Sequence, residues 1–454
     1  MSRKRLTFVI AMIVLLPVMQ TTSVAQPNIV LILSDDQAWT DYGFMGHPVI
    51  STPSLDELAG RGALFDRGYV PIALCRPSLA TIITGLYPHQ HGITGNDPSP
   101  ALAPLNSPQY AKLREELISR IDRCQTLPKL LAERGYVSFQ SGKWWEGSYR
   151  RGGFTDGMTR GFPNPGGRHG DEGLKIGRDG MQPVFTFIDS AVAEQKPFFL
   201  WYAPMMPHQP HNPPERLLAK YRAKVESLPL ARYYAMCEWF DETCGELIRY
   251  VDQKGLTNNT LFVYVSDNGW IQNPNKEGQE LRSKQSPNEG GIREPIILCW
   301  PGTIKPQRRS ELVSSIDLAP TILSAAGAKV PDNLPGENLL PLLRDGRPLS
   351  RKAIYGEGFA HDVADLNSPE ASLLYRWIIE GRWKLILTYD GKLGRYAAIH
   401  KDKERDPQLY DLSADPHEME NVAAKHPKIV QQLAQKIADW WPLTKRHVLP
   451  SAKK

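Results

Sequence analysis

The chain has 454 residues, of which 41% are hydrophobic and 23% are charged, and its formal net charge is +5. This composition is that of a globular protein with room for one large domain and a smaller one, and it excludes a mainly disordered chain. Because the mild positive charge comes without a long basic run, no nucleic-acid partner is expected. An anionic substrate is compatible with this charge but not implied by it.

The first 25 residues have the pattern of an export signal. Basic residues at 3–5 precede an apolar run at 8–18, and Ser23-Val24-Ala25 resembles a small-residue cleavage site. The apolar run is shorter than the ~20 residues of a membrane span, and no later segment is long and apolar enough either. We therefore expect residues 1–25 to be a signal peptide, with the mature chain beginning at Gln26 and working in the periplasm or the medium.

Apolar runs alternate with helical patterns over most of the chain. The runs are typical of strands buried on both faces, and they lie at 28–33, 137–140, 198–202, 261–265 and 296–300. The helical patterns lie at 54–61, 126–134, 233–254 and 317–326. This alternation predicts an α/β fold with a mainly parallel sheet flanked by helices.

The pattern changes at about residue 350. Short strands are expected at 353–356, 376–380 and 383–389, the last two joined as a hairpin. An amphipathic helix is expected at 428–440. We therefore predict an N-terminal catalytic domain over 26–349 and a smaller C-terminal α+β subdomain over 350–454.

Acidic residues follow two of the apolar runs directly. Asp35 and Asp36 end the first, and Asp267 and Asn268 end another. Because the carboxyl ends of strands in an open α/β sheet face the ligand crevice, we expect these residues at one edge. Adjacent carboxylates repel unless a cation or donors compensate, and an all-oxygen set suits calcium or magnesium rather than zinc. Asp-Asn-Gly alone is usually a turn, so only the two motifs together indicate a metal site.

Cys75 lies in an apolar stretch with helix signals. Pro77 suits the first position of a helix, Ser78 to Thr84 can continue it, and Gly85 can end it. Cys75 would then lie just before a helix N-terminus, where N–H groups and the helix dipole lower a thiol pKa and attract anions. A buried structural cysteine explains this position equally well.

The same stretch resembles the signature of a known family. Cys75-Arg76-Pro77-Ser78 followed by Thr84-Gly85 is similar to the sulfatase motif, and residues 408–421 resemble the family's C-terminal pattern. In sulfatases the cysteine is oxidised to formylglycine, whose hydrated aldehyde attacks the sulfur of a sulfate ester. The resemblance implies an alkaline phosphatase-like fold and an exported sulfatase acting on a small-molecule or oligosaccharide sulfate ester, with sulfated carbohydrates as the expected substrates. It also implies a formylglycine-generating enzyme as a partner.

The resemblance assigns roles to several residues. Its metal ligands are Asp35, Asp36, Cys75, Asp267 and Asn268, and the implied ion is calcium, with magnesium as the alternative. Its catalytic residues are Cys75, Lys143, His208 and Lys284. The two lysines would bind the sulfate group, and the histidine would protonate the leaving-group oxygen. Outside these motifs, a lone lysine is usually a solvated surface residue and a loop histidine often caps the backbone.

Two positions next to the nucleophile depart from the family pattern. Leu79 stands where sulfatases have arginine, and Trp145 stands where they have histidine. Leucine carries no charge and tryptophan offers only an N–H donor, although Trp145 could stack on a sugar ring. These departures put the conversion of Cys75 and the usual turnover route in question. Two alternatives therefore stay open: a phosphoester or phosphonate ester hydrolase of the same superfamily, and a sulfatase-like binding protein without turnover.

Overall fold

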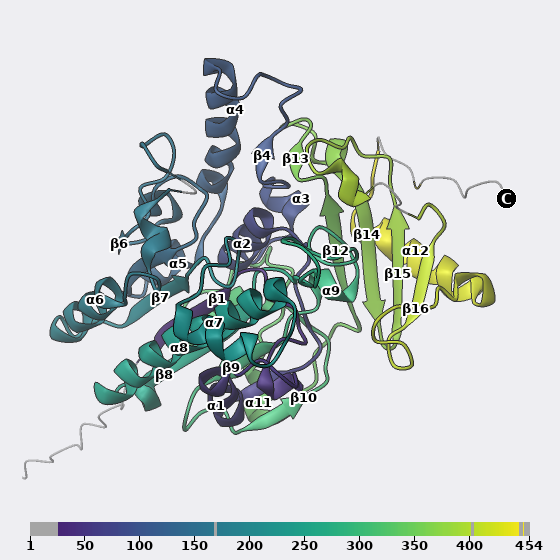
Figure 1. Ribbon diagram of the computed structural model, residues 1–454. Helices are drawn as coiled ribbons and strands as arrows, with labels where there is room; N and C mark the ends of the chain where they lie inside the picture. The colour runs from purple at the N-terminus through teal and green to yellow at the C-terminus, as the bar shows by residue number, and fades with distance from the viewer. Residues whose placement is uncertain (1–25, 168–169, 401–403, 445–447, 449–454) are drawn as a thin grey trace, which may run out of the picture.

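A computed structural model describes residues 26–167, 170–400, 404–444 and 448 (Figure 1). The predicted signal peptide lies outside the described residues. An eight-stranded sheet flanked by helices forms the larger part, and a four-stranded sheet with one long helix forms the smaller part. Within the described ranges, no helix combines the length and the apolar character that a bilayer span needs.

The large sheet is mixed and mainly parallel, which confirms the predicted fold class. Its strand order is β10-β2-β9-β8-β1-β7-β5-β6. The strands are β1 (Asn28–Ser34), β2 (Ala63–Phe65), β5 (Val137–Gly142), β6 (Asp156–Gly157), β7 (Phe198–Ala203), β8 (Thr260–Ser266), β9 (Ile296–Cys299) and β10 (Gln307–Arg309). Only β9 runs antiparallel to its neighbours β2 and β8.

Helices cover both faces of this sheet, which is why its central strands are continuous apolar runs. The flanking helices include α1 (Pro53–Arg61), α2 (Cys75–Thr84), α5 (Leu127–Ala132), α6 (Gln182–Ala193), α8 (Leu228–Gln253), α10 (Leu318–Ala325) and α11 (Leu340–Asp345). Ile29 and Leu31 of β1 pack in one core cluster with α2, α5 and α10. Val30 and Ile32 pack in the other, with α1, α6 and α8.

Two helices begin earlier than their sequence patterns predict. Helix α8 starts at Leu228 because the hydroxyl of Ser227 accepts a hydrogen bond from the N–H of Leu230. Helix α2 starts at Cys75, so the expected start at Pro77 is wrong by two residues. The first N–H groups of a helix have no partner within it, so a proline is tolerated at the third position as well as the first. Gly85 ends α2 in the left-handed region, with φ of 71°.

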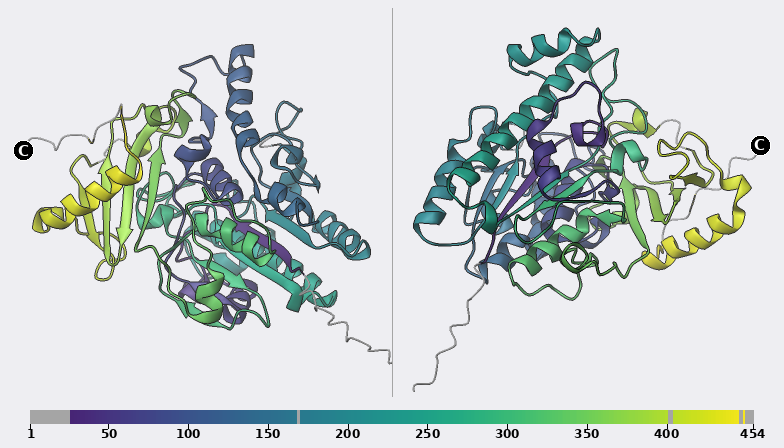
Figure 2. Two further views of the ribbon diagram at one scale, coloured as in Figure 1. Left: turned by 180° about the vertical axis from the view of Figure 1, so that it is seen from behind. Right: turned by 90° about the horizontal axis from the view of Figure 1, so that it is seen from below.

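The small sheet has the order β12-β14-β15-β16 and is antiparallel throughout. Its strands are β12 (Ala353–Phe359), β14 (Leu373–Glu380), β15 (Trp383–Thr388) and β16 (Gln408–Asp411). Ile378 and Leu385 on one face pack against helix α12 (Pro427–Trp440), which lies on the outer side of this sheet (Figure 2). Trp377 and Ile379 on the other face join the core of the large part.

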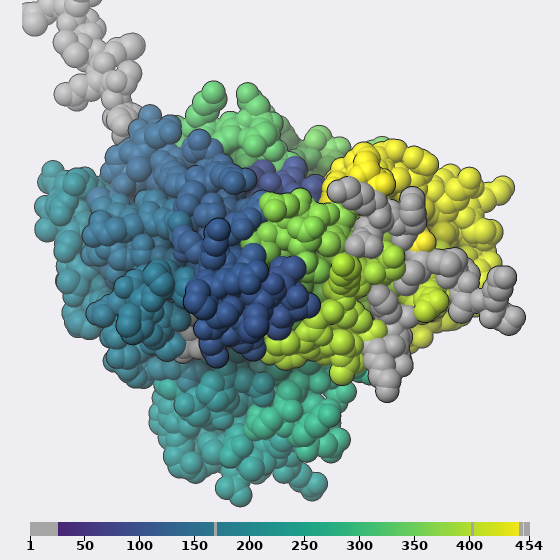
Figure 3. Space-filling view, turned by 90° about the horizontal axis from the view of Figure 1, so that it is seen from above, coloured from purple at the N-terminus to yellow at the C-terminus, as the bar shows by residue number. Residues whose placement is uncertain are grey.

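The two parts are joined by short strands and by side chains. Strand β4 (Asp97–Pro98) pairs in parallel with β13 (Asp362–Val363), and α4 (Pro108–Ile118) packs Leu117 against Val363. Figure 3 shows the blue segment that contains α4 against the green residues beyond 350. The remaining elements are β3 (Gly68–Tyr69), α3 (Pro88–His91), α7 (Glu215–Arg222), α9 (Glu289–Ile292) and β11 (Val313–Ser314).

Candidate active site

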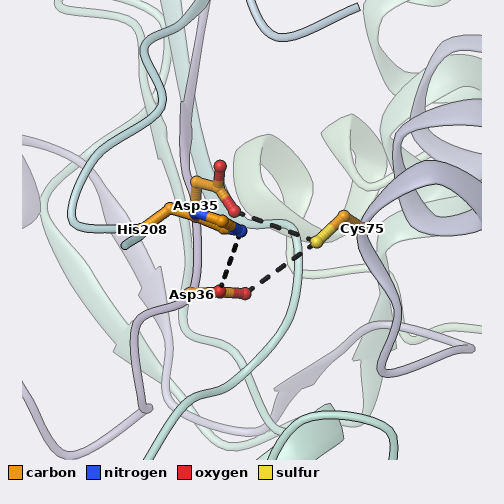
Figure 4. Close-up of side chains that lie close together, drawn as sticks. All are labelled: Asp35, Asp36, Cys75 and His208. Atoms are coloured by element: carbon orange, nitrogen blue, oxygen red, sulfur yellow. Dashed lines mark hydrogen bonds and ion pairs between the residues drawn. The ribbon is translucent and has the colours of Figure 1, made fainter. Parts of the chain in front are cut away.

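Asp35 and Asp36, which directly follow β1, lie close to Cys75 (Figure 4). The Cys75 sulfur lies 4.0 Å from Oδ1 of Asp35 and 3.9 Å from Oδ1 of Asp36. His208 joins them, with its Nε2 3.4 Å from Oδ2 of Asp36. Asp36 has a φ of 63°, a left-handed conformation that aspartate tolerates better than most residues. The chain thus turns sharply where β1 ends.

Strand register brings the second acidic motif to the same place. Strands β1 and β8 are parallel neighbours, and Ser34 is paired with Ser266. The residues that follow each strand therefore lie side by side. The N–H of Asp36 donates to Oδ1 of Asp267 at 3.3 Å, and Nδ2 of Asn268 donates to Oδ1 of Asp36 at 2.7 Å.

Two buried lysines contact this acidic cluster. Nζ of Lys143 lies 2.5 Å from Asp35 and 3.1 Å from Asp267, and Nζ of Lys284 lies 2.7 Å from Asp36. Burial alone would lower the pKa of each amine. The facing carboxylates outweigh burial and hold both pKa values above the ordinary one, so both lysines are cations at neutral pH.

Gly142 directs Lys143 into the site. It ends β5 with a φ of 80°, and a Cβ built on it would lie 1.9 Å from the carbonyl oxygen of Ala203. Both the left-handed conformation and this close approach require glycine. A glycine directly before Lys143 is therefore needed to place the lysine amine in the site.

The acidic cluster fits a hard divalent cation. Burial raises the pKa of Asp35 and raises that of Asp267 to about 7, in spite of Lys143, because carboxylates are poorly solvated here. Lys284 and His208 outweigh burial at Asp36 and keep its pKa low. Among the described residues, Oδ2 of Asp35 and Oδ1 of Asn268 are buried oxygens without a hydrogen-bond partner. Convergent carboxylates and unpaired oxygens are the donor set that calcium and magnesium take.

Cys75 is the first residue of α2 and is only 3% exposed. The sequence predicts a lowered thiol pKa at this helix start, and this prediction is wrong. Burial raises the pKa of the thiol to about 12, although Lys143 and Lys284 act in the opposite direction. In the first turn of α2, the N–H of Arg76 donates a hydrogen bond to Oδ1 of Asn96, so this N–H is not free to stabilise a thiolate. The unmodified thiol is thus a neutral group at pH 7 and a weak nucleophile.

The two departures from the family pattern have clear structural surroundings. Leu79 packs in the apolar core. Trp145 lies at the site, with its ring centroid 5.9 Å from Nζ of Lys143. Arg76 does not replace the missing arginine, because its guanidinium is engaged elsewhere: it binds both oxygens of Glu146 at 2.7 Å and the carbonyl oxygen of Asn96.

Sequence reasoning missed several residues that line the site. A cavity of about 380 Å³ is lined by Cys75, Lys143, His208 and Lys284, which we call its inner wall. Residues from three further stretches of the chain also line it, and we call them the outer wall: Asn96, Asp97, His361, Arg395 and Tyr396. None belongs to a motif, and the strand pairing that joins them spans some 265 residues, so no local signal marks them.

Comparison with known families agrees with this geometry. The family model for sulfatases matches residues 27–328. A second model, for the C-terminal part of N-sulphoglucosamine sulphohydrolase, matches residues 282–441. Together they extend over both sheets.

Individual proteins resemble the chain over most of its length. N-acetylgalactosamine-6-sulfatase of Canis lupus familiaris is 32% identical over 439 residues, which cover 86% of this chain and 81% of that protein. A solved structure from glycosaminoglycan metabolism by Bacteroides thetaiotaomicron superposes with a TM-score of 0.71 at 24% identity, covering 92% and 99% of the two chains. The phosphonate monoester hydrolase of Agrobacterium radiobacter superposes with a TM-score of 0.62 at 20% identity, covering 93% and 97%. The similarity to these two structures supports the fold only.

Proposed function

The chain belongs to the sulfatase family of sulfuric ester hydrolases, and we propose that it hydrolyses sulfate esters of sugars at the site around Cys75. One observation carries the proposal. Three carboxylates, one amide, two charged lysines and a histidine surround the residue at the start of α2. This arrangement can hold a divalent cation and an anionic ester together.

The metal would be calcium, with magnesium as the alternative. Its ligands would be Asp35, Asp36, Asp267 and Asn268 together with residue 75. When bound, such an ion polarises an oxygen of the ester. Formylglycine made from Cys75 would supply the attacking oxygen, and a formylglycine-generating enzyme would then be needed as a partner.

The other site residues bind the ester and move one proton. Lys143 and Lys284 are fixed cations that would hold the sulfate oxygens and stabilise charge as the ester bond breaks. Nδ1 of His208 lies 2.5 Å from the carbonyl oxygen of Gln209, so Nε2, 3.4 Å from Oδ2 of Asp36, is the nitrogen that would protonate the leaving oxygen. Burial lowers the pKa of this histidine to about 4, so the negative charge of the bound ester must raise it. Trp145 would contact the substrate beside Lys143.

Three further assignments are part of the proposal. Residues 1–25 would be a signal peptide, and the protein would be exported to the periplasm or the medium. The catalytic domain would extend over 26–349 and the C-terminal subdomain over 350–454. The substrate would be a sulfated amino sugar, alone or in an oligosaccharide, because the relative described above is named for one.

The test uses full-length protein made in its own cell. Purified protein is assayed against matched sulfate, phosphate and phosphonate monoesters of one aryl alcohol, and against a 6-sulfated amino sugar. We expect hydrolysis of the sulfate esters and its loss in Cys75→Ala. Preferential cleavage of the phosphate or phosphonate ester would support the superfamily alternative. A sulfated sugar that binds and stays uncleaved would support a binding protein.

Mass spectrometry of the peptide that carries residue 75 tests the nucleophile separately. We expect formylglycine in protein from its own cell, in spite of Leu79. A peptide that carries only the unmodified thiol would rule out the formylglycine route, because a buried thiol with a pKa of about 12 cannot replace it.

A further inference from the structure

A second charged cluster lies in the outer wall of the active-site cavity. It consists of Asp97, His361, Asp362 and Arg395, and we call it the outer cluster. Pairing of β4 with β13 places Asp97 directly beside Asp362. The two parts of the chain therefore build this wall jointly, and both carboxylates are buried.

Arg395 holds the two carboxylates together. Its Nη2 donates to Asp97 at 2.8 Å and to Asp362 at 2.9 Å, and its backbone N–H donates to Asp362 at 2.8 Å. The paired groups fix the guanidinium in one orientation. Its side chain nevertheless stays 37% exposed, at the cavity.

His361 supports the cluster from within the wall. Its Nδ1 lies 2.8 Å from Asp362, and its Nε2 lies 3.2 Å from the amide nitrogen of Asn96. The first contact places the proton on Nδ1, and the second makes Nε2 an acceptor, so the ring is neutral. Burial also lowers the pKa of this histidine, in spite of Asp362.

The outer cluster is not suited to a metal ion. Donor atoms of Asp97, His361 and Asp362 do lie within 4.8 Å of one another. The guanidinium of Arg395, however, already supplies the positive charge between both carboxylates. A divalent cation would have to displace a cation that several hydrogen bonds hold in place.

The chemistry of the wall favours a neutral polyhydroxylated ligand. Asp97 accepts hydrogen bonds and Arg395 donates them, so adjacent hydroxyl groups can pair with both at once. Asp97 also pairs with Arg114, whose Nη2 lies 3.4 Å from its Oδ1. The two arginines and the two carboxylates thus balance in charge, so the wall does not favour a carboxylate or a second sulfate on the ring. Trp145 and the half-exposed ring of Tyr396 line the same cavity and offer apolar faces to a sugar ring.

We propose that Asp97 and Arg395 form a subsite for hydroxyl groups of the neutral sugar ring that carries the sulfate. This inference rests on the proposed function. The sulfate would lie at Lys143 and Lys284 on the inner wall, and the ring would extend toward the outer cluster. The subsite would select sugar sulfates over aryl sulfates, which have no such hydroxyl groups.

The experiment compares variants of the holoenzyme on two substrates, a 6-sulfated N-acetylhexosamine and 4-nitrophenyl sulfate. The measured quantity is the ratio of kcat/KM for the sugar sulfate to kcat/KM for the aryl sulfate. We expect this ratio to fall about 10- to 100-fold in Arg395→Gln and in Asp97→Asn, as for the loss of hydrogen bonds to charged groups. Asp332→Asn is the control, because Asp332 is an exposed carboxylate that does not line the cavity. It should change the ratio less than threefold.

Inhibition by the two products separates sugar binding from sulfate binding. The inhibition constant of the desulfated sugar should rise about tenfold or more in Asp97→Asn, and that of inorganic sulfate should stay within twofold. If wild-type protein hydrolyses sulfate esters but neither ratio nor inhibition changes, the subsite is overturned and the proposed function stands. A loss confined to rings with a second anionic group would also overturn it. If wild-type protein cleaves no sulfate ester, the proposed function itself fails.

Discussion

At the scale of single residues, burial decides the chemistry of the site more than local sequence does. Cys75, Asp35 and Asp267 each have a raised pKa because each is almost completely removed from water. A carboxylate in such a place needs a compensating cation. Two lysines supply part of that charge, and the proposed metal would supply the rest.

The proposed metal site predicts a loss of ion-dependent stability in Asp267→Asn. After treatment with a chelator, wild-type protein should regain thermal stability when calcium is added, by about 2.7 kcal/mol at 100 times the dissociation constant. The variant should lose most of this gain, because it lacks one carboxylate ligand. Differential scanning fluorimetry measures the shift. Glu226→Gln, which changes an exposed carboxylate, is the control and should respond like wild type.

The buried carboxyl of Asp41, outside the active site, should make the free energy of unfolding depend on pH. Burial raises its pKa to about 6 in spite of a hydrogen bond from Tyr233, and the unfolded value is near 3.8. The folded state therefore binds the proton more tightly. This contribution is complete below about pH 4 and is lost as the pH rises through 6.

Asp41→Asn tests this term because the amide does not titrate. The free energy of unfolding of the variant, relative to wild type, should rise by about 1–3 kcal/mol between pH 4 and pH 7. Urea denaturation at several pH values measures it. A relative free energy that stays constant over this range contradicts the prediction.

At the scale of elements, helix α2 is held in place by a buried ion pair. Arg76 in its first turn binds Glu146, which follows Trp145 in the loop after β5, and also donates to the carbonyl of Asn96 at 2.9 Å. The pair therefore connects the residue at position 75, the loop after Lys143 and the outer wall. Both side chains are about 2–3% exposed, so neither charge is stabilised by water.

Arg76→Met should destabilise the protein by about 3–5 kcal/mol, because it leaves the Glu146 charge buried and unpaired. The double variant Arg76→Met with Glu146→Leu should recover much of this loss, since no unpaired charge remains. Chemical denaturation measures both. If the double variant is as unstable as the two single losses combined, the ion pair does not act as a unit.

At the scale of the whole molecule, a second buried network holds the two parts together. Lys384 of β15 lies 2.9 Å from Glu289 of α9 and 2.8 Å from Glu418, and all three side chains are buried. Because the outer wall of the cavity contains residues from both parts, this contact also supports the shape of the site.

Lys384→Met should cost about 3–5 kcal/mol of stability, because it removes the closest cation from two buried carboxylates. Glu289 and Glu418 would keep the longer ion pairs with Arg293 at 3.7 Å and with Arg282 at 3.9 Å. Lys436→Met is the matched control. Lys436 forms an exposed pair with Glu380, 45% and 27% exposed, which should contribute about 1 kcal/mol or less. Equal losses of stability in the two variants would contradict a larger contribution from the buried network than from the exposed pair.

Local patterns in the sequence were sufficient for the architecture. Continuous apolar runs predicted the central strands, and alternation with helical patterns predicted a mainly parallel sheet, because side-chain periodicity reflects which faces a segment buries. The predicted β14–β15 hairpin is present as an antiparallel pair. The family signature around Cys75 is also local. Polar residues at strand ends could be placed at one edge because parallel strands end together.

The tertiary structure decided what depends on contacts between distant segments. The partner of Arg76 is 70 residues away, and Asp97 meets Asp362 only because β4 pairs with β13. The raised pKa of Cys75 likewise depends on burial, which outweighs the effect expected from its place at a helix start. Periodicity within a segment depends only on residues that are close together in the sequence. Burial and charge pairing are properties of the assembled chain, so no local pattern could predict them.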